Sequence, residues 1–227
     1  MLHHNISAKH KTFGFQRLEI LAALFNGIAL FVIAGVIIWE AYGRLVVPEQ
    51  VNSESMMVIA VIGMIANVIS AWVLLQQGDI KDNINMRSAY LHIVGDALGS
   101  IGAIVAGIVM YYWHWYIADP IISILVAVVI LKGAWGVIKQ AIHILMEGTP
   151  KTIDVPGVKA KLTCIEGVLD VHELRVWSLT SGVNSLCCHL LIGDQGDSHE
   201  ILRKAVSLVK DSYPIQYTTI QVEKVHQ

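Results

Sequence analysis

Charge and cysteine are both scarce in this sequence. Only 15% of its 227 residues are charged, 55% are hydrophobic, and the formal net charge is −2. Because soluble domains are usually about 25% charged, this composition excludes a water-soluble globule, and it excludes an intrinsically disordered chain as well. The weak negative charge also argues against nucleic-acid binding, which needs a basic surface. The remaining class is an integral membrane protein.

The few cysteines exclude a disulfide scaffold. Cys164, Cys187 and Cys188 make an odd number without a framework spacing, whereas disulfide frameworks use even sets. The segment 1–17 is polar and lacks an apolar core of signal-peptide length. A cleaved secretion signal is therefore not expected there.

Long stretches without charge locate the membrane-spanning segments. A helix needs about 20 apolar residues to cross a ~30 Å hydrocarbon layer. Each spanning segment must be helical, because lipid cannot form hydrogen bonds with the backbone groups of an open strand. Asp119-Pro120 divides the longest of these stretches in two. The sequence thus predicts a four-helix membrane bundle with spans at residues 19–42, 56–77, 89–113 and 118–142.

Basic residues between the spans predict the orientation of the bundle. Cytoplasmic loops carry an excess of Lys and Arg. The connections after the first and third spans hold one basic residue, Arg44. The N-terminal segment and the connection after the second span hold the others, Lys9, Lys11, Arg17, Lys81 and Arg87. Both termini are therefore predicted to face the cytoplasm.

Charge becomes frequent again near residue 147, where a small soluble domain is predicted to begin. The membrane part is accordingly assigned to residues 19–146 and the soluble domain to residues 147–227. The periodicity and turn residues of this domain predict the order α-β-β-α-β. The predicted elements are residues 155–166, 168–179, 183–192, 198–213 and 217–225, with a hairpin at Thr180-Ser181-Gly182. This order is typical of an α+β sandwich of ferredoxin-like character.

Strand alternation predicts which side chains share a face of this sheet. The expected groups are His172, Leu174 and Val176 in the first strand, Cys187, His189 and Leu191 in the second, and Tyr217, Thr219, Gln221 and Glu223 in the last. Because neighbours in a strand point to opposite faces, only one of Cys187 and Cys188 can join a site on a given face.

An aspartate lies inside the third predicted span. Asp96 is ~10–12 Å deep at about 1.5 Å per residue, and an ionised carboxylate inside a membrane costs at least about 2.5–3.5 kcal/mol. His92 precedes it by four residues and therefore shares its helical face. Imidazole and carboxylate together suit a divalent transition metal. A buried pair that only satisfies itself or fixes helix packing is the alternative.

Two ligands do not complete a tetrahedral metal site. The other spans offer four polar residues of moderate size, Asn26, Asn67, Ser70 and Ser123. We expect these to form hydrogen bonds between helices rather than to bind metal. The half-site at His92 and Asp96 thus needs ligands from elsewhere.

Five segments of the sequence carry a family resemblance. In chain order they are KTFGFQRLEILAALFNG, RSAYLHIVGDALGSIGAIVAG, ADPIISILVA, LMEGTP and TTIQVE. Together they resemble the cation diffusion facilitator family, in its bacterial zinc, cadmium and cobalt efflux branch. The resemblance implies a homodimeric exporter in the bacterial inner membrane that exchanges Zn²⁺, and also Cd²⁺, Co²⁺ or Fe²⁺, for protons. It implies a secondary transporter and no enzyme.

The resemblance also implies roles for single residues. His92 and Asp96 match half of the family's transport site, and a histidine at the first position implies the zinc and cadmium type. Family members have six spans, and the second carries the other half of the site. This sequence begins in what resembles the histidine-bearing loop after that span, residues 1–18 with His3, His4 and His10. We therefore expect either a start at an internal methionine or a truncated protein.

In the soluble domain the resemblance implies a second place for bound Zn²⁺. His172, His189 and His199 match metal-binding histidines of the family, and Glu223 matches the acid of its closing motif. Two departures weaken this set: Gln216-Tyr217-Thr218 replaces a common histidine, and Arg175 stands where relatives often have another. A non-transporting, metal-sensing subunit that dimerises with an intact homologue is the alternative function. No H-E-x-x-H pattern supports a metalloenzyme.

Overall fold

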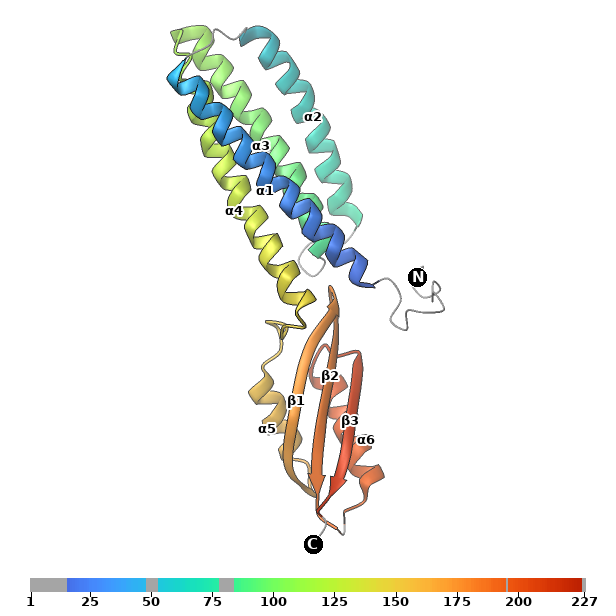
Figure 1. Cartoon of the computed structure of the whole chain (residues 1–227). Helices are drawn as coiled ribbons and strands as arrows, with labels where there is room; N and C mark the ends of the chain where they lie inside the picture. The colour runs from blue at the N-terminus through green and yellow to red at the C-terminus, as the bar shows by residue number, and fades with distance from the viewer. Residues whose placement is uncertain (1–15, 48–52, 78–83, 195, 226–227) are drawn as a thin grey trace. The chain divides into compact units, whose positions relative to one another are not determined.

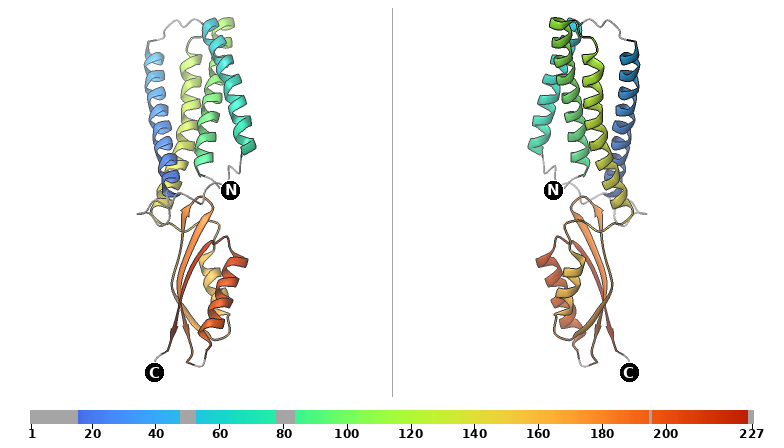
Figure 2. Two further views of the ribbon diagram at one scale, coloured as in Figure 1. Left: turned by 90° about the vertical axis from the view of Figure 1, so that its right-hand side faces the viewer. Right: turned by 90° about the vertical axis from the view of Figure 1, so that its left-hand side faces the viewer.

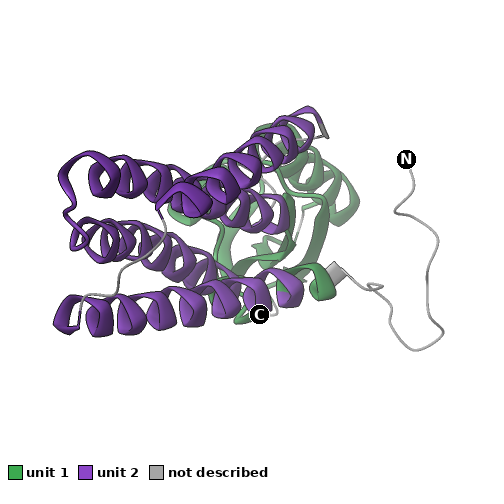
Figure 3. Cartoon of the chain, turned by 90° about the horizontal axis from the view of Figure 1, so that it is seen from above, with its two compact units in different colours: residues 1–20, 142–227 green, residues 21–141 purple. Residues whose placement is uncertain are grey.

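The computed structural model describes residues 16–47, 53–77, 84–194 and 196–225 (Figure 1). The chain divides into two compact units, residues 21–141 and a unit made of residues 142–227 with residues 1–20 (Figure 3). The first unit is a bundle of long helices, and the second contains an α+β domain. The three N-terminal histidines at positions 3, 4 and 10 lie outside the described residues.

Four helices of the described chain are long and apolar enough to cross a membrane. The helices α1 to α4 cover Gln16–Val46, Ser53–Gln77, Ile84–Trp113 and Ala118–Leu145, and Figure 1 shows them side by side. The predicted number of membrane-length helices, four, is confirmed for the described residues. Each helix begins or ends a few residues beyond its predicted span.

Small side chains let α4 pack closely against α1 and α3. Ala34 of α1 meets Ala127, Ile130 and Ala134 of α4 in a buried cluster. Between α3 and α4, a methyl group added at Gly102 would lie 2.9 Å from the side chain of Ile122, so the glycine permits the close approach. Small residues at interfaces are the usual means of helix association in membranes.

The C-terminal domain has the predicted element order. It contains α5 (Val155–Thr163), β1 (Val168–Thr180), β2 (Val183–Ile192), α6 (Ser198–Ser212) and β3 (Tyr217–Lys224). The strand order is β1-β2-β3, with β1 antiparallel and β3 parallel to β2. Both helices lie on the same face of the sheet (Figure 2). The predicted fold class, a membrane helical bundle with a small α+β domain, is confirmed.

The predicted hairpin turn is present, and the two helices of the domain begin in different ways. Gly182 adopts φ +73° in the β1–β2 hairpin, a conformation that favours glycine. The Asp197 carboxylate accepts hydrogen bonds from the amides of His199 and Glu200 and so caps α6. These two bonds lower the pKa of Asp197, since they stabilise its ionised form. Asp154 occupies the cap position of α5 but makes no side-chain cap bond.

The helix-covered face of the sheet holds the domain core. Leu186, Cys188 and Leu190 of β2 are fully buried there, against α5 and α6. Burial and the neighbouring Cys187 raise the pKa of the Cys188 thiol to about 11. Cys188 therefore acts as a core side chain rather than a thiolate ligand.

The expected alternation along β1 is wrong beyond His172. His172 pairs with His189, but Val176 pairs with the core residue Leu186, with a register shift in between. Glu173 has a positive φ of 51° at this shift. One extra residue in a strand reverses the faces that follow it. His172 therefore lies on the open face, whereas Val176 is buried in the core.

Candidate metal sites

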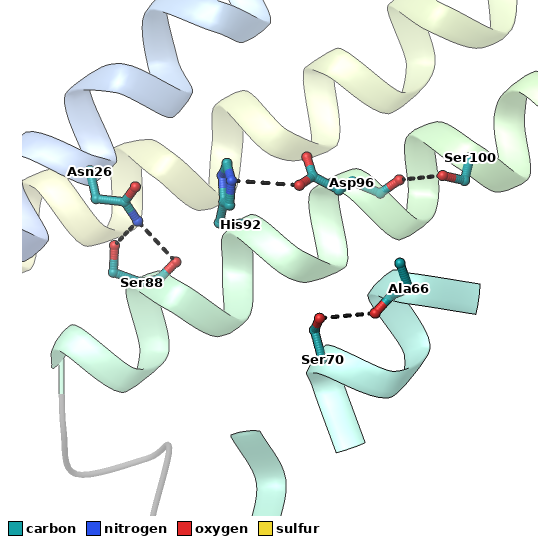
Figure 4. A network of polar contacts seen from close by, with 7 residues as sticks. All are labelled: Asn26, Ala66, Ser70, Ser88, His92, Asp96 and Ser100. Carbon is teal, nitrogen blue, oxygen red and sulfur yellow. Dashed lines mark hydrogen bonds and ion pairs between the residues drawn. The ribbon is translucent and has the colours of Figure 1, made fainter. Parts of the chain in front are cut away.

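The sequence-predicted intramembrane pair is close together in the structure. His92 and Asp96 lie one turn apart on α3, with 3.5 Å between His92 Nε2 and Asp96 Oδ2 (Figure 4). Their side chains are 44% and 52% exposed. The two groups therefore hold each other loosely and remain accessible to a third partner.

A cavity in the bundle adjoins this pair. Its volume is about 690 Å³, room for roughly 20 waters at ~30 Å³ each. All four membrane helices contribute to its wall. Its polar lining residues are Arg44, Asn67, His92, Asp96, Ser100, Asp119 and Ser123. An ion beside Asp96 could thus keep part of its hydration shell.

The second ring nitrogen of His92 is unsatisfied. Among the described residues, His92 Nδ1 is buried and has no hydrogen-bond partner. Leaving a buried polar atom unpaired costs about 1–3 kcal/mol, and such an atom in a native fold calls for an explanation. An imidazole with one nitrogen toward a carboxylate and the other unpaired is poorly explained as a packing device.

The polar residues of neighbouring helices behave differently from one another. Asn26 Nδ2 of α1 donates to both Ser88 Oγ and the Ser88 carbonyl oxygen of α3 (Figure 4), which confirms an interhelical bond. Ser70 instead donates to the Ala66 carbonyl of its own helix. The Ser88 carbonyl lies one turn before His92, so Asn26 anchors the turn of α3 that carries the imidazole.

The structure reveals an ion pair that the sequence reasoning missed. Arg44 Nη1 lies 2.5 Å from Asp119 Oδ2, and the Asp119 side chain is only 9% exposed. Asp119 was expected only to mark a helix start and Arg44 only to mark a loop. The sequence feature that could have suggested this pair is a lone arginine just after the first span together with an aspartate at the start of the fourth span.

Three sequence-predicted ligands meet on the open face of the C-terminal sheet. His172, His189 and Glu223 come from β1, β2 and β3, and one ligand atom of each lies within 4.8 Å of the others. Glu223 is 2.8 Å from His189 Nδ1 and 3.3 Å from His172 Nε2. Two imidazoles and a carboxylate form a donor set that suits Zn²⁺, with a fourth position open.

Strand pairing explains why these three residues meet. His172 stands opposite His189 in the antiparallel pair, and Glu223 stands opposite Leu191, two residues along from His189. The bulge after His172 turns the following residues over without moving His172 from the open face. The sheet backbone thus holds all three side chains on one surface.

The remaining predicted groups do not join this cluster. His199 is exposed in the first turn of α6 and is not among the grouped ligands. Gln216, at the departure from the family pattern, braces the hairpin instead: its side chain accepts from the Asn184 amide and donates to the Gly182 carbonyl. Cys187 stands opposite Arg175 and Thr219 rather than opposite a cluster residue.

Comparison with known proteins gives matches over nearly the whole chain. The transmembrane domain of cation efflux proteins matches residues 3–146, and their cytoplasmic domain matches residues 150–225. A "Cadmium, cobalt and zinc/H(+)-K(+) antiporter" of Bacillus velezensis is 44% identical over 220 residues, 96% of this chain and 70% of the relative. The zinc transporter ZitB of Escherichia coli is 39% identical over 213 residues, 93% of this chain and 67% of the relative.

Proposed function

The chain belongs to the cation diffusion facilitator family of cation efflux proteins, and on that premise we propose that it exports Zn²⁺ in exchange for protons. Cd²⁺ and Co²⁺, which the name of the Bacillus velezensis relative includes, are further substrates, and Fe²⁺ is a candidate on the same ligand chemistry. The protein is a secondary transporter in the inner membrane, with both termini in the cytoplasm, as its basic residues indicate.

The observation that carries this proposal is the His92–Asp96 pair in the wall of a cavity that all four membrane helices line. The two side chains are half exposed and 3.5 Å apart, so a cation can enter between them. Metal ligands must be deprotonated, and therefore protons and metal compete for the pair. Rocking of the helices exposes the pair to each side in turn.

The C-terminal domain is proposed to sense the metal load of the cytoplasm and to form the homodimer. Its cluster of His172, His189 and Glu223 offers three ligands, one short of a closed structural zinc site. A residue of a second copy or a water completes the coordination. Zn²⁺ is thus both substrate and regulatory ion, and residues 147–227 form the regulatory domain.

Zinc uptake into inside-out vesicles that hold the full chain tests the transport function. His92→Asn removes the imidazole from the pair, and we expect the uptake rate to fall at least about tenfold, a change equivalent to ~1.4 kcal/mol. His114→Asn is the matched control, because His114 lies after α3 and does not line the cavity. Undiminished uptake by His92→Asn refutes the assignment. Zinc binding without any uptake favours the alternative, a metal-sensing subunit.

A further inference from the structure

The Arg44–Asp119 ion pair lies at one end of the cavity that holds the proposed transport pair. Arg44 is in the last turn of α1 and Asp119 in the first turn of α4, so both lie at the same end of the bundle. Both residues line the cavity, together with His92 and Asp96. The cavity therefore has two pairs of charged or titratable groups in its wall.

The two pairs are too far apart to bind one ion together. Gly102 of α3 packs against Ile122 and Val126 of α4, and the two helices run in opposite directions. Asp119 is thus level with a point ten residues beyond Asp96 on α3, or ~15 Å at about 1.5 Å per residue. A cation that leaves Asp96 toward this end of the bundle therefore reaches Asp119 later, as a separate binding position.

Stability does not explain the ion pair. Replacing a buried ion pair by apolar side chains is often neutral or stabilising, because desolvation offsets the attraction. Asp119 is 9% and Arg44 27% exposed at the side chain, so both groups have lost most of their water. Buried ion pairs are best attested where they fix a register or act as a switch.

The pair is held through one nitrogen of the guanidinium. Only Nη1 of Arg44 bonds to Asp119, whereas the strongest arginine–carboxylate pairs use two parallel bonds. Among the described residues, Arg44 Nε is buried without a partner. The guanidinium thus keeps an unused donor, and the pair lacks the second, parallel bond.

We propose that Arg44 and Asp119 form the gate at this end of the cavity. While paired, the guanidinium occupies the carboxylate as a tethered cation, repels a returning metal ion and closes the end. An outgoing Zn²⁺ displaces Arg44, uses Asp119 as its last protein carboxylate and then departs, after which the pair forms again. This gate rests on the proposed export function, but closure of the cavity can be tested without transport.

The test measures how fast a thiol inside the cavity reacts with a membrane-impermeant reagent from each side. Ser123→Cys supplies the thiol, because Ser123 lines the cavity one turn inside Asp119. In the full chain Cys164 and Cys187 are replaced by serine, and the fully buried Cys188 stays. Right-side-out and inside-out vesicles are labelled in parallel.

We expect Arg44→Gln and Asp119→Asn each to raise the labelling rate about tenfold or more from one side only, equivalent to ~1.4 kcal/mol of the closed state. Lys132→Gln is the matched control, since Lys132 is a charged residue of α4 outside the cavity lining. The exchanged pair, Arg44→Asp with Asp119→Arg, restores protection. Arg44→Lys keeps the positive charge, so protected labelling in this variant would show that the effect of Arg44→Gln comes from the lost charge and not from a lost fold.

Two results overturn the gate. Unchanged labelling in Arg44→Gln and Asp119→Asn shows that the pair does not close the cavity. Labelling that rises equally from both sides shows that the pair only holds α1 to α4. Zinc uptake measured on the same vesicles separates the two proposals: one-sided labelling without uptake in the parent chain refutes export but not closure, and normal uptake with unchanged labelling refutes the gate alone.

Discussion

The bundle and the C-terminal domain present the same ligand chemistry in opposite settings. In the bundle, two groups on one helix lie 3.5 Å apart beside a cavity. In the domain, three groups on three strands lie within 4.8 Å of one another, with contacts of 2.8 and 3.3 Å to a shared carboxylate. A single helix turn can reorient when helices move, whereas a hydrogen-bonded sheet holds its side chains in place.

This contrast matches what each proposed site has to do. A transport site must release its ion, so an incomplete ligand set that protons can compete for is an advantage. A sensing site must keep its ion at a given concentration, so more ligands on a stiffer scaffold are needed. The bundle pair is therefore suited to a cation that passes through, and the domain cluster to a cation that stays bound.

The largest expected effect comes from removing the carboxylate of the bundle pair. Asp96→Asn keeps the size of the side chain and removes its charge. We expect zinc uptake into vesicles to fall at least about 100-fold, because the cation loses the charge that offsets its desolvation. Zinc bound by the C-terminal domain should stay unchanged in an equilibrium titration of the same protein. A joint loss of both would mean that the two sites are not independent.

The complementary change is Glu223→Gln in the C-terminal cluster. Loss of even an outer-shell partner lowers metal affinity about 10–100-fold, and Glu223 contacts both histidines directly. We expect the zinc affinity of the domain to fall by about 100-fold, as measured by competition with a chelating dye. Residual uptake at saturating zinc should persist, since the bundle pair is intact.

His199→Asn is the matched control for Glu223→Gln. It changes a histidine of the same domain that is exposed and outside the cluster. We expect its zinc affinity to stay within about twofold of the parent, since surface changes away from special features shift free energy by only about 0.5 kcal/mol. A loss as large as that of Glu223→Gln would place His199 in the coordination sphere after all, as the family resemblance implies.

The sequence predicted the elements of both regions because their signals are local. Charge-free stretches specify membrane helices, and the Thr180-Ser181-Gly182 turn specifies the hairpin of the domain. The proximity of His92 and Asp96 could be predicted for the same reason, because the two residues lie one helical turn apart. The strand groups were predicted by alternation, which fails at the bulge after His172 because a single added residue leaves no periodic signal.

Contacts between distant segments could not be predicted from local sequence patterns. Arg44 and Asp119 are separated by 75 positions, and a lone arginine after one span and an aspartate at the start of another do not by themselves indicate that the end of α1 lies beside the start of α4. The exclusion of His199 depends likewise on where α6 begins relative to β2 and β3. Predicting such contacts requires the packing of helices and the register of strands, which arise from the whole fold.

The smallest effect concerns the cap of α6, which should affect the domain and leave the bundle unchanged. Asp197→Ala removes the acceptor for the amides of His199 and Glu200, so hydrogen exchange at the start of α6 should accelerate while peptides of α1–α4 keep their rates. The pKa of Asp197 is lower in the folded chain than its ordinary 3.8. Its stabilising contribution is therefore complete above that ordinary value and is lost as the pH falls through the lowered one. In Asp197→Asn, which caps without a charge, the protection factor at the start of α6 should not change over this acid range, because that factor is the exchange rate corrected for its intrinsic pH dependence. If the parent chain and Asp197→Asn respond to acid alike, the carboxylate does not hold the helix start.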